Sequence, residues 1–257
     1  MLQQLKHLAA RHLPNRLQFR LRQLARPFGR PEPELALVAA LARTDRAFLD
    51  VGANKGLYIE AALGRFAQVF AIEPNPAMAA YLRDCFGERC QILPLALSDR
   101  EGTLQLYVPR RGQQAIASRG SLEPEANQGL EQTSIPVRVT RLDGLTLPPL
   151  GLVKIDVEGH EQAVLEGGRG RWASDRPPLL IEIEERHHPG RSDAVVGLLA
   201  ELGYAACYLE GGRLRWLDGT PVAALQAAAD AYVNNFLFLH REDETARAAL
   251  RAAALLA

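Results

Sequence analysis

The chain has 257 residues, of which 47% are hydrophobic and 23% are charged, and its formal net charge is zero. This composition is typical of a soluble globular protein with a full core, and no apolar run is long enough to be a membrane span or a signal peptide. Three scattered cysteines without a CxxC spacing argue against a disulfide framework and a structural zinc site, so we expect a cytoplasmic protein.

Residues 1–45 are predicted to form a basic helical arm that precedes the main domain. In residues 1–30, leucines recur at helical spacing, and the charged residues between them are all lysine or arginine. The simpler interpretation is an arm that packs on the domain through its leucines. The alternative is a surface that binds an anionic membrane, which would place the protein at the membrane periphery. We expect no nucleic-acid partner.

The main domain, residues 46–241, begins with a predicted strand that ends in an acid and a glycine turn. Apolar residues precede Asp50, and Gly52 and Gly56 then open a helical pattern. Such a turn leaves backbone N–H groups accessible to a ligand. Its Asp-x-Gly-x-x-x-Gly spacing differs from the Gly-x-Gly-x-x-Gly spacing of nicotinamide and flavin folds. An acid before the glycines favours a positively charged ligand, such as the methionine end of S-adenosylmethionine.

A second acid, Glu73, ends the next predicted strand, about twenty residues beyond the glycines. In nucleotide-binding doubly wound folds, an acid at this place accepts hydrogen bonds from ribose hydroxyls. The alternative is a plain α/β protein in which neither the turn nor the acid binds a ligand.

Strand and helix patterns alternate through the domain, which predicts parallel βαβ units in a three-layer αβα sandwich. The third strand, predicted over residues 91–99, ends at Ser98 and Asp99, where an adenine ring would lie between apolar side chains. Two later segments alternate with a period of two and predict antiparallel strands. The polar stretch between them, residues 110–132, is predicted to be a mobile loop on the substrate side.

The fourth predicted strand carries three charged residues at its carboxyl end. Lys154, Asp156 and Glu158 occupy alternate positions and therefore lie on one side of the strand. Open α/β sheets bind ligands at this edge, and each buried charge costs several kcal/mol unless it is paired. These residues are therefore catalytic candidates, although a structural ion pair between Lys154 and Asp156 is the alternative. His160, at the start of the next helix, is a further candidate.

The fifth predicted strand, residues 178–185, places Glu182 at the neighbouring strand end. Asp156 and Glu182 could supply oxygen ligands to a divalent metal ion, and His187 and His188 follow closely. A solvated turn is the simpler interpretation of the histidines, so no metal site is assigned. The chain ends with two predicted strands, residues 204–210 and 235–240, and a C-terminal helix over residues 242–257.

Four motifs in this order resemble those of the FkbM-type methyltransferases. They are Asp50 to Gly56, Ile72 to Pro76, Ala96 to Asp99 and Lys154 to Gly159. The last two are specific, whereas the first two are shared by most S-adenosylmethionine enzymes. The resemblance covers about residues 46–187 and implies a class I methyltransferase fold, which is Rossmann-like, with a mostly parallel sheet and an antiparallel edge strand.

The resemblance also implies S-adenosylmethionine as the methyl donor and a hydroxyl of a sugar, glycolipid or secondary metabolite as the acceptor. It places the ribose hydroxyls at Glu73 and the adenine ring beside Ser98 and Asp99. The residues that would hold the methionine and ribose side belong to the glycine turn: Asp50, Gly52, Ala53, Asn54 and Gly56.

The catalytic base is not identified by the resemblance. An alcohol is a poor nucleophile at neutral pH, so its methylation benefits from a base or a metal ion near the hydroxyl. We expect Asp156 or His160 to be the base and Lys154 to orient the carboxylate, with Glu158 and Glu182 within reach. Two other functions stay open: a nicotinamide-dependent oxidoreductase, against which the glycine spacing argues, and a non-catalytic binding protein recruited through the basic arm.

Overall fold

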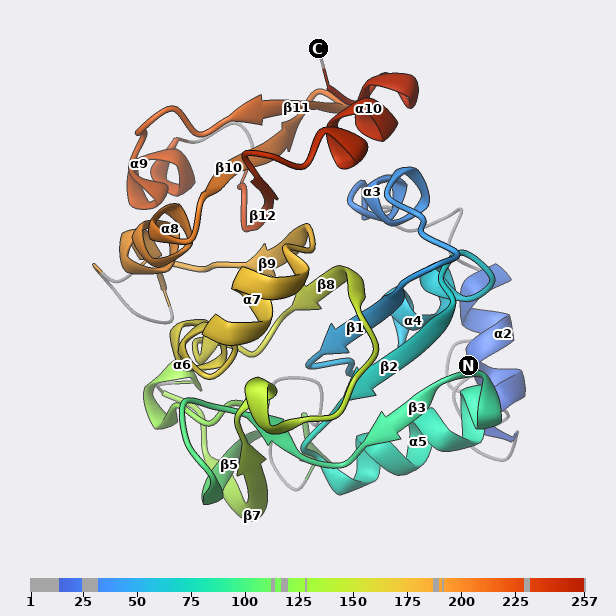
Figure 1. The fold of residues 1–257 in the computed structure, drawn as a ribbon. Helices are drawn as coiled ribbons and strands as arrows, with labels where there is room; N and C mark the ends of the chain where they lie inside the picture. Colours follow the sequence, from blue (N-terminus) through green and yellow to red (C-terminus); the bar gives the residue numbers. More distant parts are fainter. Residues whose placement is uncertain are drawn as a thin grey trace, which may run out of the picture.

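The computed structural model describes residues 14–24, 32–111, 114–116, 120–127, 129–186, 190, 192–228 and 232–256. In these residues a twisted sheet lies between two layers of helices (Figure 1). The predicted three-layer αβα sandwich is thereby confirmed.

The main sheet is mostly parallel. Its strands, in spatial order, are β11 (Arg213–Trp216), β10 (Tyr204–Glu210), β12 (Asn235–His240), β9 (Leu179–Glu182), β8 (Leu150–Ile155), β1 (Ala47–Val51), β2 (Gln68–Ile72) and β3 (Gln91–Leu93). The strand β11 is antiparallel to β10 at the edge, as expected, and β12 is antiparallel to both of its neighbours inside the sheet. The carboxyl ends of β1, β2, β8 and β9 therefore meet at one edge of the sheet.

Helices cover both faces of this sheet. One face carries α6 (Glu161–Glu166), α7 (Arg169–Asp175), α8 (Ser192–Glu201) and α9 (Val222–Ala227). The other carries α2 (Asn15–Leu24), α3 (Leu35–Ala40), α4 (Leu57–Ala62), α5 (Pro76–Phe86) and α10 (Glu244–Ala252). Side chains of β1 alternate between the two cores, since Leu49 and Val51 join the first and Phe48 joins the second. Asp50 therefore faces the second helix layer.

A small second sheet lies beside the main one. Its order is β4 (Ala96–Leu97), β7 (Gln132–Thr140), β5 (Gly102–Arg111) and β6 (Gln114–Ala115). The single third strand predicted over residues 91–99 is thus two strands, β3 and β4, in different sheets. Pro94 lies between them, and proline cannot donate a ladder hydrogen bond.

The predicted antiparallel strands are β5 and β7, but the stretch between them is not a plain loop where it is described. It contains β6 and the 3₁₀ helix η4 (Pro124–Asn127). Ser121 also pairs with Tyr107 of β5 through two backbone hydrogen bonds of 2.7 and 3.0 Å. Two further 3₁₀ helices are η2 (Gly87–Arg89) and η5 (Leu142–Gly144). Residues 120–127 are named the insert below. Ser121 of the insert pairs with β5, and the backbone oxygens of Pro124 and Asn127 accept from Gln132 of β7.

The first and last described helices, α2 and α10, belong to the second helix layer. On α2, the buried ring of Phe19 meets the ring of Phe86 edge-on, with 5.1 Å between centroids, and Asn15 donates to Asp84 at 2.8 Å. These contacts agree with a packed arm, although residues 1–13 and 25–31 lie outside the described residues. At the other end, α10 is capped by Asp243 and buries Leu250 in the core.

In the described part of the chain, no helix is long and apolar enough to cross a bilayer.

Candidate active site

Two adjoining cavities open at the carboxyl ends of β1, β2, β8 and β9. The first, of about 610 Å³, is named the apolar cavity after its walls: Val51, Ile72, Leu97, Leu106 and Leu122. The second, of about 1680 Å³, is named the acidic cavity after five carboxyl residues in its lining: Glu32, Glu34, Asp50, Asp156 and Glu182. The two cavities share Gly52, Asn54 and Asp156, so one ligand can extend from one into the other.

The shared border is fixed by a close crossing of two chain segments. Gly52 has a φ of +81°, and a Cβ placed on it would lie 1.8 Å from the backbone oxygen of Asp156. The N–H of Asp156 also donates to the backbone oxygen of Val51 at 2.9 Å. Only glycine permits this approach, which brings Asp156 against the turn.

Gly56 has a different role, although the sequence pattern groups it with Gly52. It has a φ of +77° and precedes α4, and a Cβ on it would lie 2.3 Å from the ring of Phe86. It lines neither cavity. Its small size therefore serves the packing of α4 on α5, whereas Ala53 lines the acidic cavity and Asn54 lines both.

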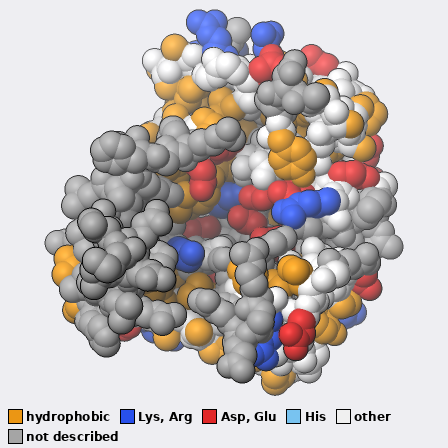
Figure 2. All heavy atoms as spheres, turned by 180° about the vertical axis from the view of Figure 1, so that it is seen from behind, with side chains coloured by type: hydrophobic (Ala, Val, Ile, Leu, Met, Phe, Trp, Pro, Cys, Tyr) orange, Lys and Arg blue, Asp and Glu red, His pale blue; other side chains and the backbone are white. Residues whose placement is uncertain are grey.

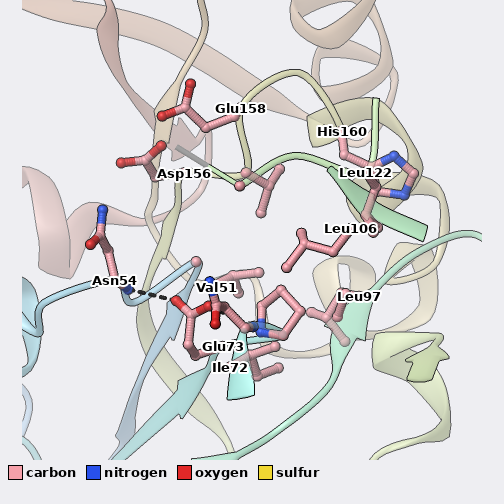
Figure 3. A pocket seen from close by; sticks show the side chains of 16 residues that line it. Val51, Asn54, Ile72, Glu73, Leu97, Leu106, Leu122, Asp156, Glu158 and His160 are labelled. Carbon is pink, nitrogen blue, oxygen red and sulfur yellow. Dashed lines mark hydrogen bonds between the residues drawn. The ribbon is translucent and has the colours of Figure 1, made fainter. Parts of the chain in front are cut away.

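Glu73 is held at the floor of the apolar cavity by two backbone N–H groups. Its Oε2 accepts from Asn54 at 2.8 Å and its Oε1 from Asn75 at 2.9 Å (Figure 3). The side chain is 6% exposed, and burial raises its pKa to about 7 while these two donors oppose the rise. Since a carboxylate has about four acceptor sites, Glu73 can still accept from a ligand.

The walls of the apolar cavity come from several elements. Val51 and Ile72 end β1 and β2, Leu97 belongs to β4, and Leu106 and Leu122 come from β5 and the insert. A slot with these walls suits the faces of an aromatic ring. Sequence reasoning missed Leu106 and Leu122, although the period-two alternation of β5 already placed Leu106 on a buried face.

His160 lies at the end of the apolar cavity that is remote from Asp156 (Figure 3). Its Nδ1 donates to Glu123 Oε1 at 2.6 Å, because an ionised carboxylate only accepts. Its Nε2 lies 3.0 Å from Ser98 Oγ, which in turn donates to Asp99 Oδ1 at 3.0 Å. Ser98 is fully buried, and neither it nor Asp99 lines the apolar cavity. Ser98 contacts His160 and Asp99 contacts Ser98, and both ring nitrogens of His160 are engaged.

Asp50 and Lys154 lie on the floor of the acidic cavity. The ammonium of Lys154 donates to Asn235 Oδ1 at 2.9 Å and to Ile155 O at 3.5 Å, and it lies over the ring of Tyr58. These hydrogen bonds go to an amide and the backbone, not to Asp156 as the structural ion-pair alternative requires. Burial raises the pKa of Asp50 to about 8, and the charge of Lys154 opposes the rise.

Asp156 and Glu182 are brought together, as their adjacent strand ends predicted. Burial raises the pKa of Asp156, and burial together with the charge of Asp156 raises the pKa of Glu182 to about 9. Two carboxyl groups whose charges act on each other disfavour simultaneous ionisation, so a proton is retained on the pair more readily than on an isolated carboxyl. Asn234 Nδ2 also donates to Glu182 Oε1 at 2.9 Å.

Asp156 and Glu182 alone supply two carboxyl groups, which is fewer ligands than a metal site needs. In the ranges that the structure describes, no three His, Cys, Asp or Glu side chains are grouped so that they could hold a metal ion. His187 and His188 lie outside those ranges.

Two residues of the site hold unusual backbone conformations. Asn54 and Glu158 have φ values of +48° and +52° without being glycine. Such conformations cost about 1–3 kcal/mol and cluster at functional sites. Glu158 lines the apolar cavity, and its backbone oxygen accepts from Ser121 Oγ at 2.6 Å, which ties the insert to the end of β8.

This sheet order, with Asp50 near the end of β1, Glu73 directly after β2 and a glycine turn between them, is that of the class I methyltransferase fold. The family model described as "Methyltransferase FkbM domain" matches residues 50–206, and the chain belongs to this family. The resemblance of the four sequence motifs is thereby confirmed. No curated protein matches the chain significantly.

One solved structure supports the same fold, and others are similar to a smaller extent. The methyltransferase FkbM from Methylobacillus flagellatus superposes with a TM-score of 0.53 at 16% identity, over 82% of this chain and 48% of that one. An rRNA methylase from Streptococcus thermophilus gives a TM-score of 0.46 at 13% identity, over 82% and 95% of the two chains. A precorrin-6y C5,15-methyltransferase from Geobacter metallireducens gives a TM-score of 0.41 at 14% identity, and the match covers 80% of this chain and 83% of that one. At 16% identity the likeness to the Methylobacillus flagellatus protein concerns the fold alone, and this chain spans about half of that protein's length.

Proposed function

We propose that this methyltransferase uses S-adenosylmethionine and methylates a hydroxyl group of a small molecule, of the sugar, glycolipid or secondary-metabolite class. The observation that carries the proposal is the meeting of two cavities at Gly52, Asn54 and Asp156. A nucleoside suits the apolar cavity, and an acceptor has room in the acidic one. The family membership supports a methyl donor of this kind.

The residues present fit the cofactor. The apolar slot suits its adenine ring, and Glu73, already fixed by two backbone donors, has acceptor sites left for ribose hydroxyls. The methionine end would pass Gly52 and Ala53 toward Asp50, whose Oδ2 has no hydrogen-bond partner among the described residues. When bound, S-adenosylmethionine supplies an electrophilic methyl group on a positively charged sulfur.

Asp156 is the proposed base. It is the only one of the predicted base candidates in the described residues that lines both cavities, so it lies where acceptor and donor would meet. Its raised pKa makes its ionised form a stronger base, and the neighbouring charge of Glu182 is coupled to it electrostatically. Asp156 would take the hydroxyl proton as the acceptor oxygen becomes methylated. His160, whose ring nitrogens are both engaged, would position the insert instead.

Calorimetric titrations with S-adenosylmethionine and NAD test the cofactor, and binding of the first alone is expected. The acceptor is then sought by incubating small-molecule extracts with methyl-labelled cofactor, and the product should carry the label on oxygen. On this acceptor, Asp156→Asn should bind the cofactor normally and turn over at least about a hundredfold more slowly. Label on nitrogen or carbon, or wild-type turnover by Asp156→Asn, would refute the proposal.

A further inference from the structure

Ser121, in the insert, uses all of its hydrogen-bonding groups inside the protein. Its Oγ donates to the backbone oxygen of Glu158 at 2.6 Å and accepts from the N–H of Glu123 at 3.0 Å. Its own N–H and backbone oxygen pair with Tyr107 of β5 at 3.0 and 2.7 Å. The residue is 1% exposed. Ser121 is therefore a fixed point from which one hydroxyl group reaches the segment after β8.

The backbone that receives this hydrogen bond has an unfavourable conformation. Glu158 has a φ of +52°, in the left-handed region that residues other than glycine adopt only at a cost. Gly159 follows with a φ of +105°, and the chain turns here from β8 into α6. The hydrogen bond from Ser121 offsets part of the cost, so its loss would allow this turn to relax toward a more common conformation.

The turn at Glu158 is directly connected to the proposed base. Only Val157 separates Asp156 from Glu158. On its other side, Asp156 is held by the glycine turn, because its N–H donates to Val51 and Gly52 crosses its backbone oxygen. In Figure 3 the side chains of Asp156 and Glu158 lie next to each other at one end of the pocket. A change in the backbone at Glu158 would therefore also move Asp156.

The acidic cavity leaves Asp156 open on the side where an acceptor would bind. Asp156 belongs to the lining of this cavity, and Figure 2 shows acidic side chains gathered around a hollow on the face seen from behind. Because Asp156 borders open volume here, its position depends on how its backbone is anchored. The glycine turn is one anchor, and Ser121, through Glu158, is a second.

Ser121 also lies next to the proposed cofactor site. Gly120 and Leu122, its two neighbours in the chain, line the apolar cavity, whereas Ser121 itself lines neither cavity. A nucleoside in the apolar cavity would contact both neighbours and hold the insert in place. Occupation of the cofactor site can thus act on the Ser121 hydroxyl without touching it.

We propose that Ser121 is a positioning residue that couples the cofactor site to the proposed base. Its hydroxyl holds the backbone of Glu158, and thereby the carboxyl of Asp156, in the arrangement needed for methyl transfer. A nucleoside that fixes the insert strengthens this hold. The inference rests on the proposed function and adds to it a residue that lines neither the cofactor site nor the acceptor site.

Hydrogen exchange tests the coupling without an acceptor. Peptides that cover residues 156–160 are followed by mass spectrometry in the protein alone and with saturating S-adenosylhomocysteine. Binding should slow exchange in this segment at least about fivefold in the wild type, and Ser121→Ala should lose most of this protection. Ser121→Thr keeps the hydroxyl group and should keep the protection. Ser134→Ala is the matched control, because Ser134 is an exposed serine that pairs with Tyr107 from β7 and lines neither cavity.

Kinetics on the acceptor found with methyl-labelled cofactor provide a second measurement. At saturating cofactor, Ser121→Ala should lower kcat at least about tenfold, because the proposed base is no longer held in place. The KM of the acceptor should stay within about threefold of wild type, since the hydroxyl does not bind the acceptor. Ser121→Thr should recover kcat to within about threefold of wild type.

Ser121→Cys has a weaker donor and should fall between Ser121→Ala and the wild type, so it decides the question if Ser121→Ala does not fold. Three results overturn the inference: no protection of residues 156–160 in the wild type, equal protection in the wild type and in the variant without the hydroxyl, or a folded Ser121→Thr that behaves like Ser121→Ala. Wild-type turnover by Ser121→Ala also overturns it. Failure of the wild type to bind S-adenosylhomocysteine would instead refute the proposed use of S-adenosylmethionine.

Discussion

Asp50 and Lys154 lie directly opposite each other in neighbouring parallel strands, on the same face of the sheet, and are 2% and 1% exposed. Burial disfavours the charged form of Asp50 and raises its pKa. The charge of Lys154 instead opposes the rise in the pKa of Asp50, and it acts in the same direction on Asp156 and Glu182. One buried ammonium thus acts on three carboxyl groups of the acidic cavity, although burial remains the larger effect on each of them.

A double-mutant cycle should detect this relationship. Asp50→Asn and Lys154→Met each remove one charge, and the double variant removes both. Because the residues are neighbours in one electrostatic network, their effects on the free energy of unfolding should deviate from additivity by about 0.5–3 kcal/mol. Urea denaturation of the four proteins without ligand measures it. Additive effects would mean that the two charges do not interact.

Glu73→Ala should weaken the binding of S-adenosylmethionine by about 1–3 kcal/mol, because the ribose hydroxyls would lose a charged acceptor. Calorimetry measures the change directly. Glu60→Ala serves as the control and should bind as the wild type does, since Glu60 is remote from the apolar cavity. Wild-type affinity in Glu73→Ala would place the nucleoside elsewhere.

His160→Ala should affect cofactor binding more than turnover. His160 holds Glu123 of the insert, and the insert carries Leu122 into the wall of the apolar cavity. Loss of this attachment should weaken the binding of S-adenosylmethionine by about 1–2 kcal/mol. Glu123→Gln weakens the same hydrogen bond from the side of the insert and should have a similar effect. At saturating cofactor, kcat should stay within about threefold of wild type. A loss of about 10²–10⁴ in kcat with unchanged cofactor affinity would identify His160 as the base instead.

The ligand-free protein should become less stable as the pH rises, and Glu182 should contribute to this trend. Burial raises its pKa from 4.5 to about 9, the charges of Asp156 and Glu184 add to the rise, and Lys154 opposes it. The unfolded chain releases this proton first, so the stabilising contribution is full below pH 4.5 and is lost as the pH rises through about 9.

Glu182→Gln has no proton to lose, so its melting temperature should fall less between about pH 5 and about pH 9 than that of the wild type. Scanning calorimetry at several pH values measures how steeply the melting temperature falls with pH in the variant and in the wild type. Glu60→Gln is the control for the loss of one carboxyl group. Identical slopes in Glu182→Gln and the wild type would show that Glu182 ionises normally in the folded state.

The residues at strand ends could be predicted from the sequence because parallel strands bring their carboxyl ends to one edge. Apolar runs located the ends of β1, β2, β8 and β9, and Asp50, Glu73, Asp156 and Glu182 follow from them. The motif itself did not reveal that Asp50 and Glu73 line different cavities. That division depends on which face of each strand a side chain occupies.

Other parts of the site have no local signal. Asn235 accepts from Lys154 across 81 residues of sequence, and Glu34 reaches the acidic cavity from the segment before α3. His160 suggested a base because of its place after the fourth motif, yet its two partners come from other segments. Tertiary packing decides such contacts, and hydrophobic periodicity does not report them.

The crossing of Gly52 over the backbone of Asp156 limits how this protein can diverge. A side chain at position 52 cannot fit. A shift of the glycine turn or of the segment after β8 would move the proposed S-adenosylmethionine site and the proposed base together. The positions of Gly52 and Asp156 therefore have to stay constant while the acceptor molecule changes. New specificity has to arise at the rims, in the insert, in the segment around Glu34 and in the residues that lead into β12, where replacements leave the crossing untouched.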